Sequence, residues 1–307
     1  MSRPKNKILL NVLIILVSII YGLPNIILSN KLKDEFSPLI VSPFSPIARD
    51  EAYAYAPFVN YVLQGHLFLK DIYVSEYSND PSPYIGESGP AVVFALLTKF
   101  TGSIERSFIA ADFIFPPMVF LLLYLFTKKY IKNDYISMSI SFLTVIARDF
   151  IAVIPFPATT LKYVLVLEHQ SHFLYFSRAF HPQFTFIFLL VACISMIEIV
   201  NNSRSKLRIL ILGIFFGLLF YSYVFYWTLF SFFFGLVFLT NLIKKNYLVC
   251  KNLALSGLIA LIINSYYFYN IFQFYQLEVS QNFIEKTTLA GFPLPLTFFR
   301  YLLIAII

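Results

Sequence analysis

The sequence predicts an all-α integral membrane protein: a polytopic helix bundle of about eight spans plus a short half-helix, with a long helical extracytoplasmic loop after the first span. Three observations lead to this prediction. The 307-residue chain is 59% hydrophobic and only 13% charged, with a mean hydropathy of +0.75, whereas an average soluble domain is about 25% charged. Its apolar residues gather in stretches of about 20, the length that crosses a hydrocarbon core roughly 30 Å thick. Its basic residues gather in short clusters between those stretches.

The composition excludes several classes of protein. A chain this apolar is neither disordered nor an ordinary soluble enzyme. The formal net charge is +7, but because the basic residues cluster beside apolar stretches, it does not indicate a nucleic-acid partner. The two cysteines, Cys193 and Cys250, cannot form a disulfide framework. The sequence contains no Gly-rich phosphate loop, which argues against a nucleotide-driven pump.

The first predicted span covers residues 8–29. This apolar stretch is longer than the apolar region of a signal peptide. The later predicted spans are residues 107–127, 135–156, 181–200, 207–223, 226–243, 252–273 and 294–307. A tight hairpin is expected near residues 223–226, because the uncharged run from 209 to 243 is too long for one span. The chain ends inside a hydrophobic stretch, so we expect residues 1–307 to form a single membrane domain that is truncated at its C-terminus.

Residues 90–101 are apolar but only about a dozen long, so they are expected to lie in the interface or to re-enter the membrane. The basic residues test this expectation. If residues 90–101 do not cross, four basic clusters all lie on the cytoplasmic side with the N-terminus, as the positive-inside rule requires. The clusters are Arg3, Lys5 and Lys7; Lys128, Lys129 and Lys132; Arg204, Lys206 and Arg208; and Lys244, Lys245 and Lys251.

This topology places residues 30–106 outside the cytoplasm, as one loop that holds more than half of the acids of the chain. Residues from about 48 to 64 have the apolar spacing of an amphipathic helix. The acidic pair Asp50 and Glu51 lies near the start of that helix. A turn rich in Pro and Gly then leads into the half-helix, which ends at Gly102.

The layout resembles the C-type (GT-C) membrane glycosyltransferases, such as protein O-mannosyltransferases and bacterial aminoarabinose or mannose transferases. Those proteins begin with a cytoplasmic N-terminus and one span, followed by an outer loop with an acidic pair on a juxtamembrane helix. The resemblance covers residues 8–127. The matching residues are Asp50, Glu51, Tyr53, Gly65, Asp71, Pro90, Gly102 and Arg106.

The resemblance implies an inverting sugar transfer from a polyprenyl-phosphate donor to an acceptor hydroxyl on the extracytoplasmic face, in cell-envelope glycan biosynthesis. The acceptor hydroxyl loses its proton as it attacks the anomeric carbon, so Asp50 is the expected base. Glu51 would orient Asp50, contact acceptor hydroxyls or bind a cation. Both acids would equally well cap a helix N-terminus.

The expected partners are the lipid-linked donor, membrane lipids and an acceptor glycan, lipid or protein, with no nucleic acid. Some members of the superfamily use a divalent cation and others do not, so a divalent cation stays possible and no metal ligand is assigned. The implied location is the inner membrane of a bacterium, with the N-terminus in the cytoplasm.

A second polar cluster lies within residues 162–182. A phosphate leaving group needs cations where its charge develops, and the planar fork of Arg178 matches phosphate oxygens. Its alternative role is an interfacial anchor. The other predicted substrate-binding residues are Lys162, His181, Tyr53 and Glu87, although the preferred interpretation of Glu87 from sequence is an ordinary exposed turn acid. Glu168, His169 and His172 are expected to line an aqueous region rather than to bind a metal.

Two other functions stay open at this point: a transporter or flippase of lipid-linked saccharides, and a non-catalytic GT-C-like membrane protein. A transporter would favour repeated halves with broken helices near the membrane midplane. The sequence shows no internal repeat, and its polar residues lie near the predicted outer face.

Overall fold

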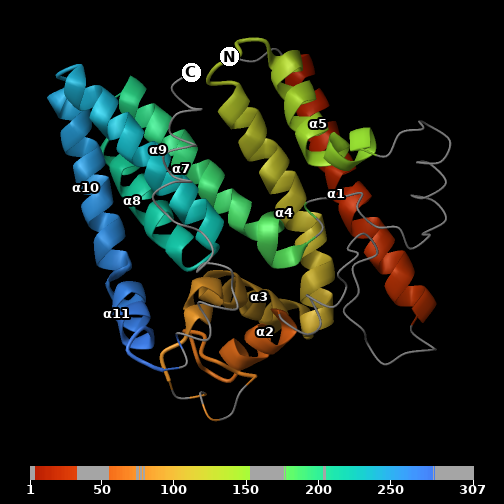
Figure 1. Ribbon diagram of the computed structural model, residues 1–307. Coiled ribbons are helices and arrows are strands. Elements are labelled where there is room, and N and C mark those ends of the chain that lie inside the picture. Colours follow the sequence, from red (N-terminus) through yellow and green to blue (C-terminus); the bar gives the residue numbers. More distant parts are fainter. Residues whose placement is uncertain are drawn as a thin grey trace.

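The computed structural model describes residues 4–32, 55–73, 76, 78, 80–152, 176, 178–202, 205–278 and 280. Every regular element in these residues is helical, which confirms the all-α prediction (Figure 1). In chain order they are α1 (Pro4–Leu32), α2 (Ala56–Leu63), η3 (Pro83–Glu87), α3 (Ser88–Thr101), α4 (Ile104–Thr127), α5 (Asp134–Ala152), η5 (Ala179–Phe184), α7 (Thr185–Asn201), α8 (Lys206–Phe220), α9 (Val224–Ile243), α10 (Tyr247–Ile263) and α11 (Ser265–Phe274).

Within the described residues, 4 helices are long and apolar enough to cross a membrane, or up to 5 if one bent pair counts as a single span. They are Asn6–Ile27, Ile104–Thr127, Ala179–Asn201 and Val224–Ile243. The predicted span 207–223 corresponds to α8, which has only 15 residues. The predicted span 135–156 corresponds to α5, of which the part Asp134–Ile146 is a shorter apolar helix. The last predicted span, 294–307, lies outside the described residues.

The predicted span 252–273 differs from expectation because it is bent. It consists of α10 and α11, which meet at an angle of 53°. Asn264 and Ser265 lie at the break, and the Ser265 hydroxyl donates to the carbonyl oxygen of Ile262 at 2.9 Å. Short polar side chains compete with helical backbone bonds in this way, whereas the hydropathy of the segment carries no sign of a bend.

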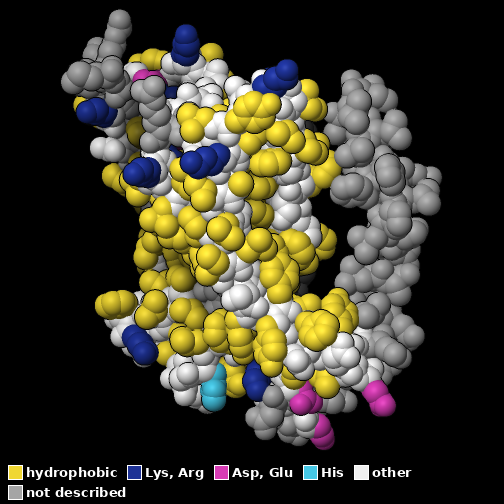
Figure 2. Space-filling model, turned by 90° about the vertical axis from the view of Figure 1, so that its left-hand side faces the viewer, with side chains coloured by type: hydrophobic (Ala, Val, Ile, Leu, Met, Phe, Trp, Pro, Cys, Tyr) yellow, Lys and Arg dark blue, Asp and Glu magenta, His cyan; other side chains and the backbone are white. Residues whose placement is uncertain are grey.

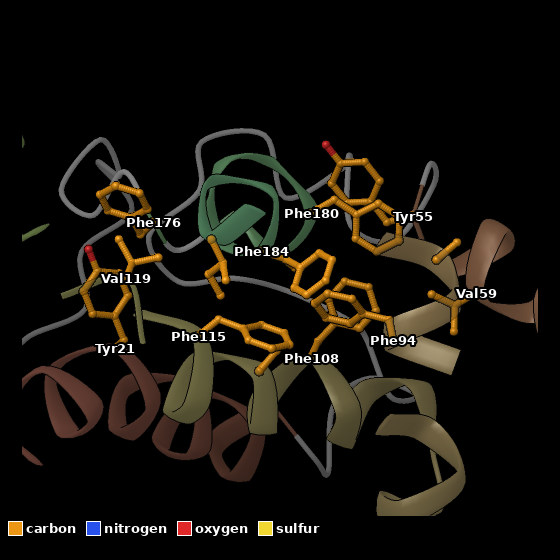
Figure 3. Close-up of a cluster of buried hydrophobic side chains, with 14 of the residues drawn as sticks. Tyr21, Tyr55, Val59, Phe94, Phe108, Phe115, Val119, Phe176, Phe180 and Phe184 are labelled. Atoms are coloured by element: carbon orange, nitrogen blue, oxygen red, sulfur yellow. The ribbon is translucent and has the colours of Figure 1, made fainter. Parts of the chain in front are cut away.

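The helices form two packed groups (Figure 1). In one group α4 contacts α1 and α5, and in the other α8 contacts α7 and α10; the groups meet where α4 contacts α7. Figure 3 shows the core of the first group, in which phenylalanine rings from α3, α4 and η5 interleave. Apolar side chains gain little by leaving lipid for protein, so close van der Waals packing holds such helices together.

Two glycines allow α8 and α10 to pack closely together in the second group. A Cβ atom built on Gly213 of α8 would lie 2.6 Å from the Cβ of Ile259 on α10, and one on Gly217 would lie 2.9 Å from the Cβ of Ile263. Both positions therefore require glycine. They are four residues apart, the small-xxx-small spacing typical of tightly packed membrane helices.

One end of the bundle is crossed by α2 and α3 (Figure 1). α3 has 14 residues, about 21 Å of helix, which is too short to span a bilayer. It ends at Gly102, whose φ of 85° is left-handed, and Ser103 then caps α4 by accepting from the backbone N–H of Arg106 at 3.1 Å. We call the end that carries α2, η3 and α3 the loop end.

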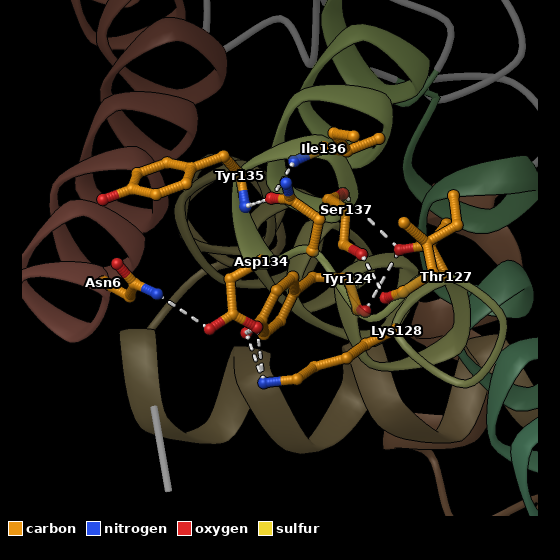
Figure 4. A network of polar contacts seen from close by, with 10 residues as sticks. Asn6, Tyr124, Thr127, Lys128, Asp134, Tyr135, Ile136 and Ser137 are labelled. Carbon is orange, nitrogen blue, oxygen red and sulfur yellow. Dashed lines mark hydrogen bonds and ion pairs between the residues drawn. The ribbon is translucent and has the colours of Figure 1, made fainter. Parts of the chain in front are cut away.

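The opposite end carries many of the basic residues, and we call it the basic end (Figure 2). Its described basic residues include Lys128, Lys129, Lys132, Arg208, Lys244 and Lys245. Figure 4 shows one network there: Lys128 pairs with Asp134 at 2.7 Å, and Asn6 donates to the same carboxylate at 2.9 Å. The hydrogen bond to Asp134 raises the pKa of Lys128. Glu198 of α7 pairs with both Lys129 and Arg208.

Candidate functional site at the loop end

Three of the predicted site residues lie in the described part of the chain and four do not. Glu87, Arg178 and His181 are described. Asp50, Glu51, Tyr53 and Lys162 lie outside the described residues, as do Glu168, His169 and His172. The geometry below therefore concerns the surroundings of the first three.

Arg178 directly precedes η5, an irregular turn before α7, and His181 lies within that turn. Pro182 has no backbone N–H and disfavours a helical conformation in the residue before it. His181 accordingly has the extended dihedral angles φ −129° and ψ 119°, and its peptide bond to Pro182 is cis. Arg178, which precedes η5, is also extended, with ψ 114°. The segment thus presents its side chains differently from a regular helix.

His181 is held through both ring nitrogens. Its Nε2 pairs with Oε2 of Glu87, and its Nδ1 lies 3.3 Å from the hydroxyl oxygen of Thr185. The imidazole also stacks on the ring of Tyr223, with centroids 4.2 Å apart, and is only 6% exposed. A buried imidazole beside a carboxylate is an arrangement suited to proton transfer or to fixing one tautomer.

Arg178 contacts the start of α2. One of its terminal nitrogens donates to the hydroxyl oxygen of Tyr55 at 3.3 Å. The Tyr55 ring stacks on Phe180 at 4.2 Å and meets the His181 ring edge-on at 5.9 Å; Figure 3 shows Tyr55 directly against Phe180. The segment that follows the acidic pair is therefore packed against the segment that carries Arg178 and His181.

The turn that carries Glu87 is clamped in place. The backbone N–H of Gly89 donates to the carbonyl oxygen of Tyr221 at 2.7 Å, and a Cβ atom on Gly89 would lie 2.7 Å from that same oxygen. Asn270 of α11 donates to the carbonyl oxygen of Ser82 at 2.8 Å. With its backbone fixed on both sides, the turn directs Glu87 toward His181, and the Glu87 side chain is 27% exposed.

Two tyrosines that contact Phe58 of α2 have phenols with a raised pKa. Burial raises the pKa of Tyr73 to about 12, with smaller contributions from Tyr84 and Asp71. Burial and Asp71 also raise the pKa of Tyr84. These two rings contact Phe58 of α2 at centroid distances of 5.9 Å and 5.6 Å. Like ordinary tyrosines, both phenols are protonated at neutral pH and can donate hydrogen bonds at the loop end, and the raised pKa extends this protonation to more alkaline pH.

The structure adds residues that sequence reasoning missed. Tyr55, Tyr223 and Thr185 surround Arg178 and His181, but only tertiary packing reveals them. Asp112 is different, because an acid inside the predicted span 107–127 is a signal in itself. It is buried, and it accepts hydrogen bonds from Asn25 of α1 and Gln183 of η5.

In the described part of the chain, no three His, Cys, Asp or Glu side chains are grouped so that they could hold a metal ion. Comparison with known proteins finds no matching family model, no similar curated protein and no similar solved structure.

Proposed function

We propose that the protein is a membrane glycosyltransferase that transfers a sugar from a polyprenyl-phosphate donor to an acceptor hydroxyl at its loop end. The contact between Arg178 and Tyr55 carries this proposal. It joins the cation expected to bind the donor phosphate to the chain segment that follows the acidic pair. Sugar transfer needs both kinds of group around one substrate: a base for the acceptor and a cation for the leaving group.

Covalent geometry limits how far the acids can be from that contact. Glu51 and Asp50 precede Tyr55 by four and five residues, and five fully extended residues span at most about 18 Å. A sugar phosphate with its acceptor extends over a comparable length. Asp50 is therefore a feasible base for a donor whose phosphate is bound by Arg178, and Glu51 would orient it.

The remaining predicted residues would act around the donor. Arg178 would stabilise the phosphate as the glycosidic bond breaks, because a guanidinium binds two phosphate oxygens at once. His181 and Glu87 lie close by as a pair and would contact the sugar phosphate. Tyr53 and Lys162 would complete the set. The lipid tail of the donor would lie along the apolar belt seen between the two ends in Figure 2.

The proposed orientation follows from charge. Basic residues of later helices share one end of the bundle with the N-terminus (Figure 1). By the positive-inside rule that end is cytoplasmic and the loop end extracytoplasmic. Reaction at the loop end would then use donors on the outer leaflet, in keeping with envelope glycan synthesis at a bacterial inner membrane.

The test is turnover of the full chain, purified in lipid nanodiscs with a polyprenyl-phosphate sugar and mixed acceptors. Asp50→Asn is expected to lower turnover by about a hundredfold or more, because the general base is lost, while donor binding is retained. Glu76→Gln, a matched change at an exposed acid of the same loop, leaves turnover unchanged. Undiminished transfer by Asp50→Asn would contradict the assigned base, and absence of transfer by the wild type with every donor would contradict the function.

A further inference from the structure

Asp112 is an acid inside the membrane-spanning helix α4. Its side chain is buried, at 5% exposure, as are those of its partners Asn25 and Gln183, at 5% and 0%. Ionisable residues within membrane-spanning helices are rare, face the interior of the bundle and tend to mark functional positions.

The contacts of Asp112 join three parts of the chain. The side-chain amide of Asn25, on α1, donates to one carboxylate oxygen. The side-chain amide of Gln183, on η5, donates to the other. The carboxylate of α4 thereby connects the first helix to the irregular turn that carries His181.

This cluster is costly to bury. The amide oxygens of Asn25 and Gln183 are both buried and accept no hydrogen bond from the described residues. Buried amide oxygens that accept no hydrogen bond disfavour folding relative to apolar side chains of similar volume.

Gln183 connects the cluster to the loop-end site. Its backbone N–H donates to the carbonyl oxygen of Arg178 at 3.2 Å, and only Pro182 separates it from His181. Because Pro182 donates no backbone hydrogen bond and His181 is extended, η5 is not a regular α-helix at its centre. The bond from the Gln183 side chain to Asp112 attaches this irregular segment to α4.

We propose that Asp112 is a positioning residue: by accepting from Gln183 it fixes the rotation of η5, so that His181 faces Glu87 and Arg178 faces Tyr55. The proposal goes beyond the proposed function, because it concerns the geometry of the loop-end site whichever reaction that site supports.

The test measures how fast diethyl pyrocarbonate modifies His181 in the full chain, residue by residue, by mass spectrometry. His66 is exposed and serves as the reference within the same molecule. Gln183→Leu removes the hydrogen bond between η5 and Asp112. Its matched control, Asn25→Leu, removes the hydrogen bond between α1 and Asp112. Both remove one amide donor from the same carboxylate.

Gln183→Leu and Asp112→Leu are expected to raise the ratio of His181 to His66 modification about tenfold, the effect of losing one charge-assisted hydrogen bond. Asn25→Leu is expected to change it by less than about twofold, because η5 keeps its bond. A purely structural role would lower thermal stability in all three variants without separating these ratios, and equal ratios in Gln183→Leu and Asn25→Leu would overturn the proposal.

A fourth variant keeps the test decisive if Asp112→Leu fails to fold. The exchange Asp112→Asn with Gln183→Glu moves the carboxylate to η5 and the amide to α4, with nearly unchanged volumes. It is expected to restore the ratio to within about twofold of the wild type. A ratio as high as that of Gln183→Leu would show that the pair does not position η5.

Discussion

The two ends of the bundle both carry charged pairs, but the cationic partners differ in how far their side chains are exposed. At the basic end, Lys128, Lys129 and Arg208 keep 32–38% of their side chains exposed while they pair with acids. At the loop end, His181 is almost fully buried, stacks on Tyr223 and pairs with a carboxylate delivered by a clamped turn.

The difference separates orientation from chemistry. Partly exposed ion pairs contribute little to stability, about 0–1 kcal/mol, and the gathering of basic residues at this end is in keeping with the proposed sidedness of membrane insertion. At the loop end the imidazole of His181 is buried among aromatic rings, whereas the Glu87 carboxylate that pairs with it is 27% exposed. A buried imidazole beside a carboxylate that reaches the surface is an arrangement suited to a functional site.

The largest effect is expected from removing the loop-end cation. Arg178→Gln should lower sugar transfer by about a hundredfold, because a preorganised donor to the leaving phosphate is lost. The measurement is turnover at saturating donor in nanodiscs. Its matched control is Arg208→Gln at the basic end, which should leave turnover unchanged. Equal losses in both variants would remove the distinction between the two ends.

The next largest effect is expected from disturbing the backbone contact between Gly89 and Tyr221, which fixes the turn that carries Glu87. Gly89→Ala should destabilise the protein by about 1–3 kcal/mol, because the new methyl group meets the Tyr221 carbonyl oxygen and the turn must shift. Thermal unfolding in detergent measures this. Gly235→Ala on α9 has open space around it and should be neutral or slightly stabilising, since alanine favours a helix. Tolerance of both substitutions would argue against a fixed turn.

A smaller effect is expected at the basic end. Asp134→Asn weakens the pair with Lys128 but keeps the side-chain volume. The free energy of unfolding should fall by less than about 1 kcal/mol, because the pair is partly exposed. A loss several times larger in denaturant titration would contradict the small contribution to stability assigned to this network.

The smallest expected effect concerns alkaline pH. Because the pKa of Tyr73 is raised to about 12, the folded state binds more protons than the unfolded state above pH 10, so stability falls as pH rises from about 10 to 12. Tyr73→Phe removes this contribution. The midpoint of unfolding should therefore fall less steeply with pH over that range in the variant than in the wild type. An identical pH profile in wild type and variant would exclude a role for this phenol.

Much of the helical layout is predictable from sequence, because apolar length alone marks α1, α4, α7 and α9 as spans. The bend between α10 and α11 is not, because it arises from Asn264 and Ser265 rather than from hydropathy. The short length of α8 is also hidden, since the apolar run continues past its end at Phe220 into the turn before α9.

The candidate site was predictable only in part. The charges of Arg178, His181 and Glu87 stand out beside apolar spans, and their residue types suggest phosphate or proton chemistry. That Glu87 faces His181 depends on a contact between residues 94 positions apart. That Tyr55 meets Arg178 depends on one between residues 123 positions apart. No local pattern encodes either contact.

The most direct test of the assignment of chemistry to the loop end compares two changes from a carboxylate to an amide, one at each end of the bundle. Glu87→Gln removes the charge that pairs with His181, and Glu198→Gln removes the charge that pairs with Lys129 and Arg208. In one sugar-transfer assay, Glu87→Gln should lower turnover at least about tenfold, and Glu198→Gln should leave it within about twofold of the wild type. Equal turnover in the two variants would contradict the assignment of the chemistry to the loop end.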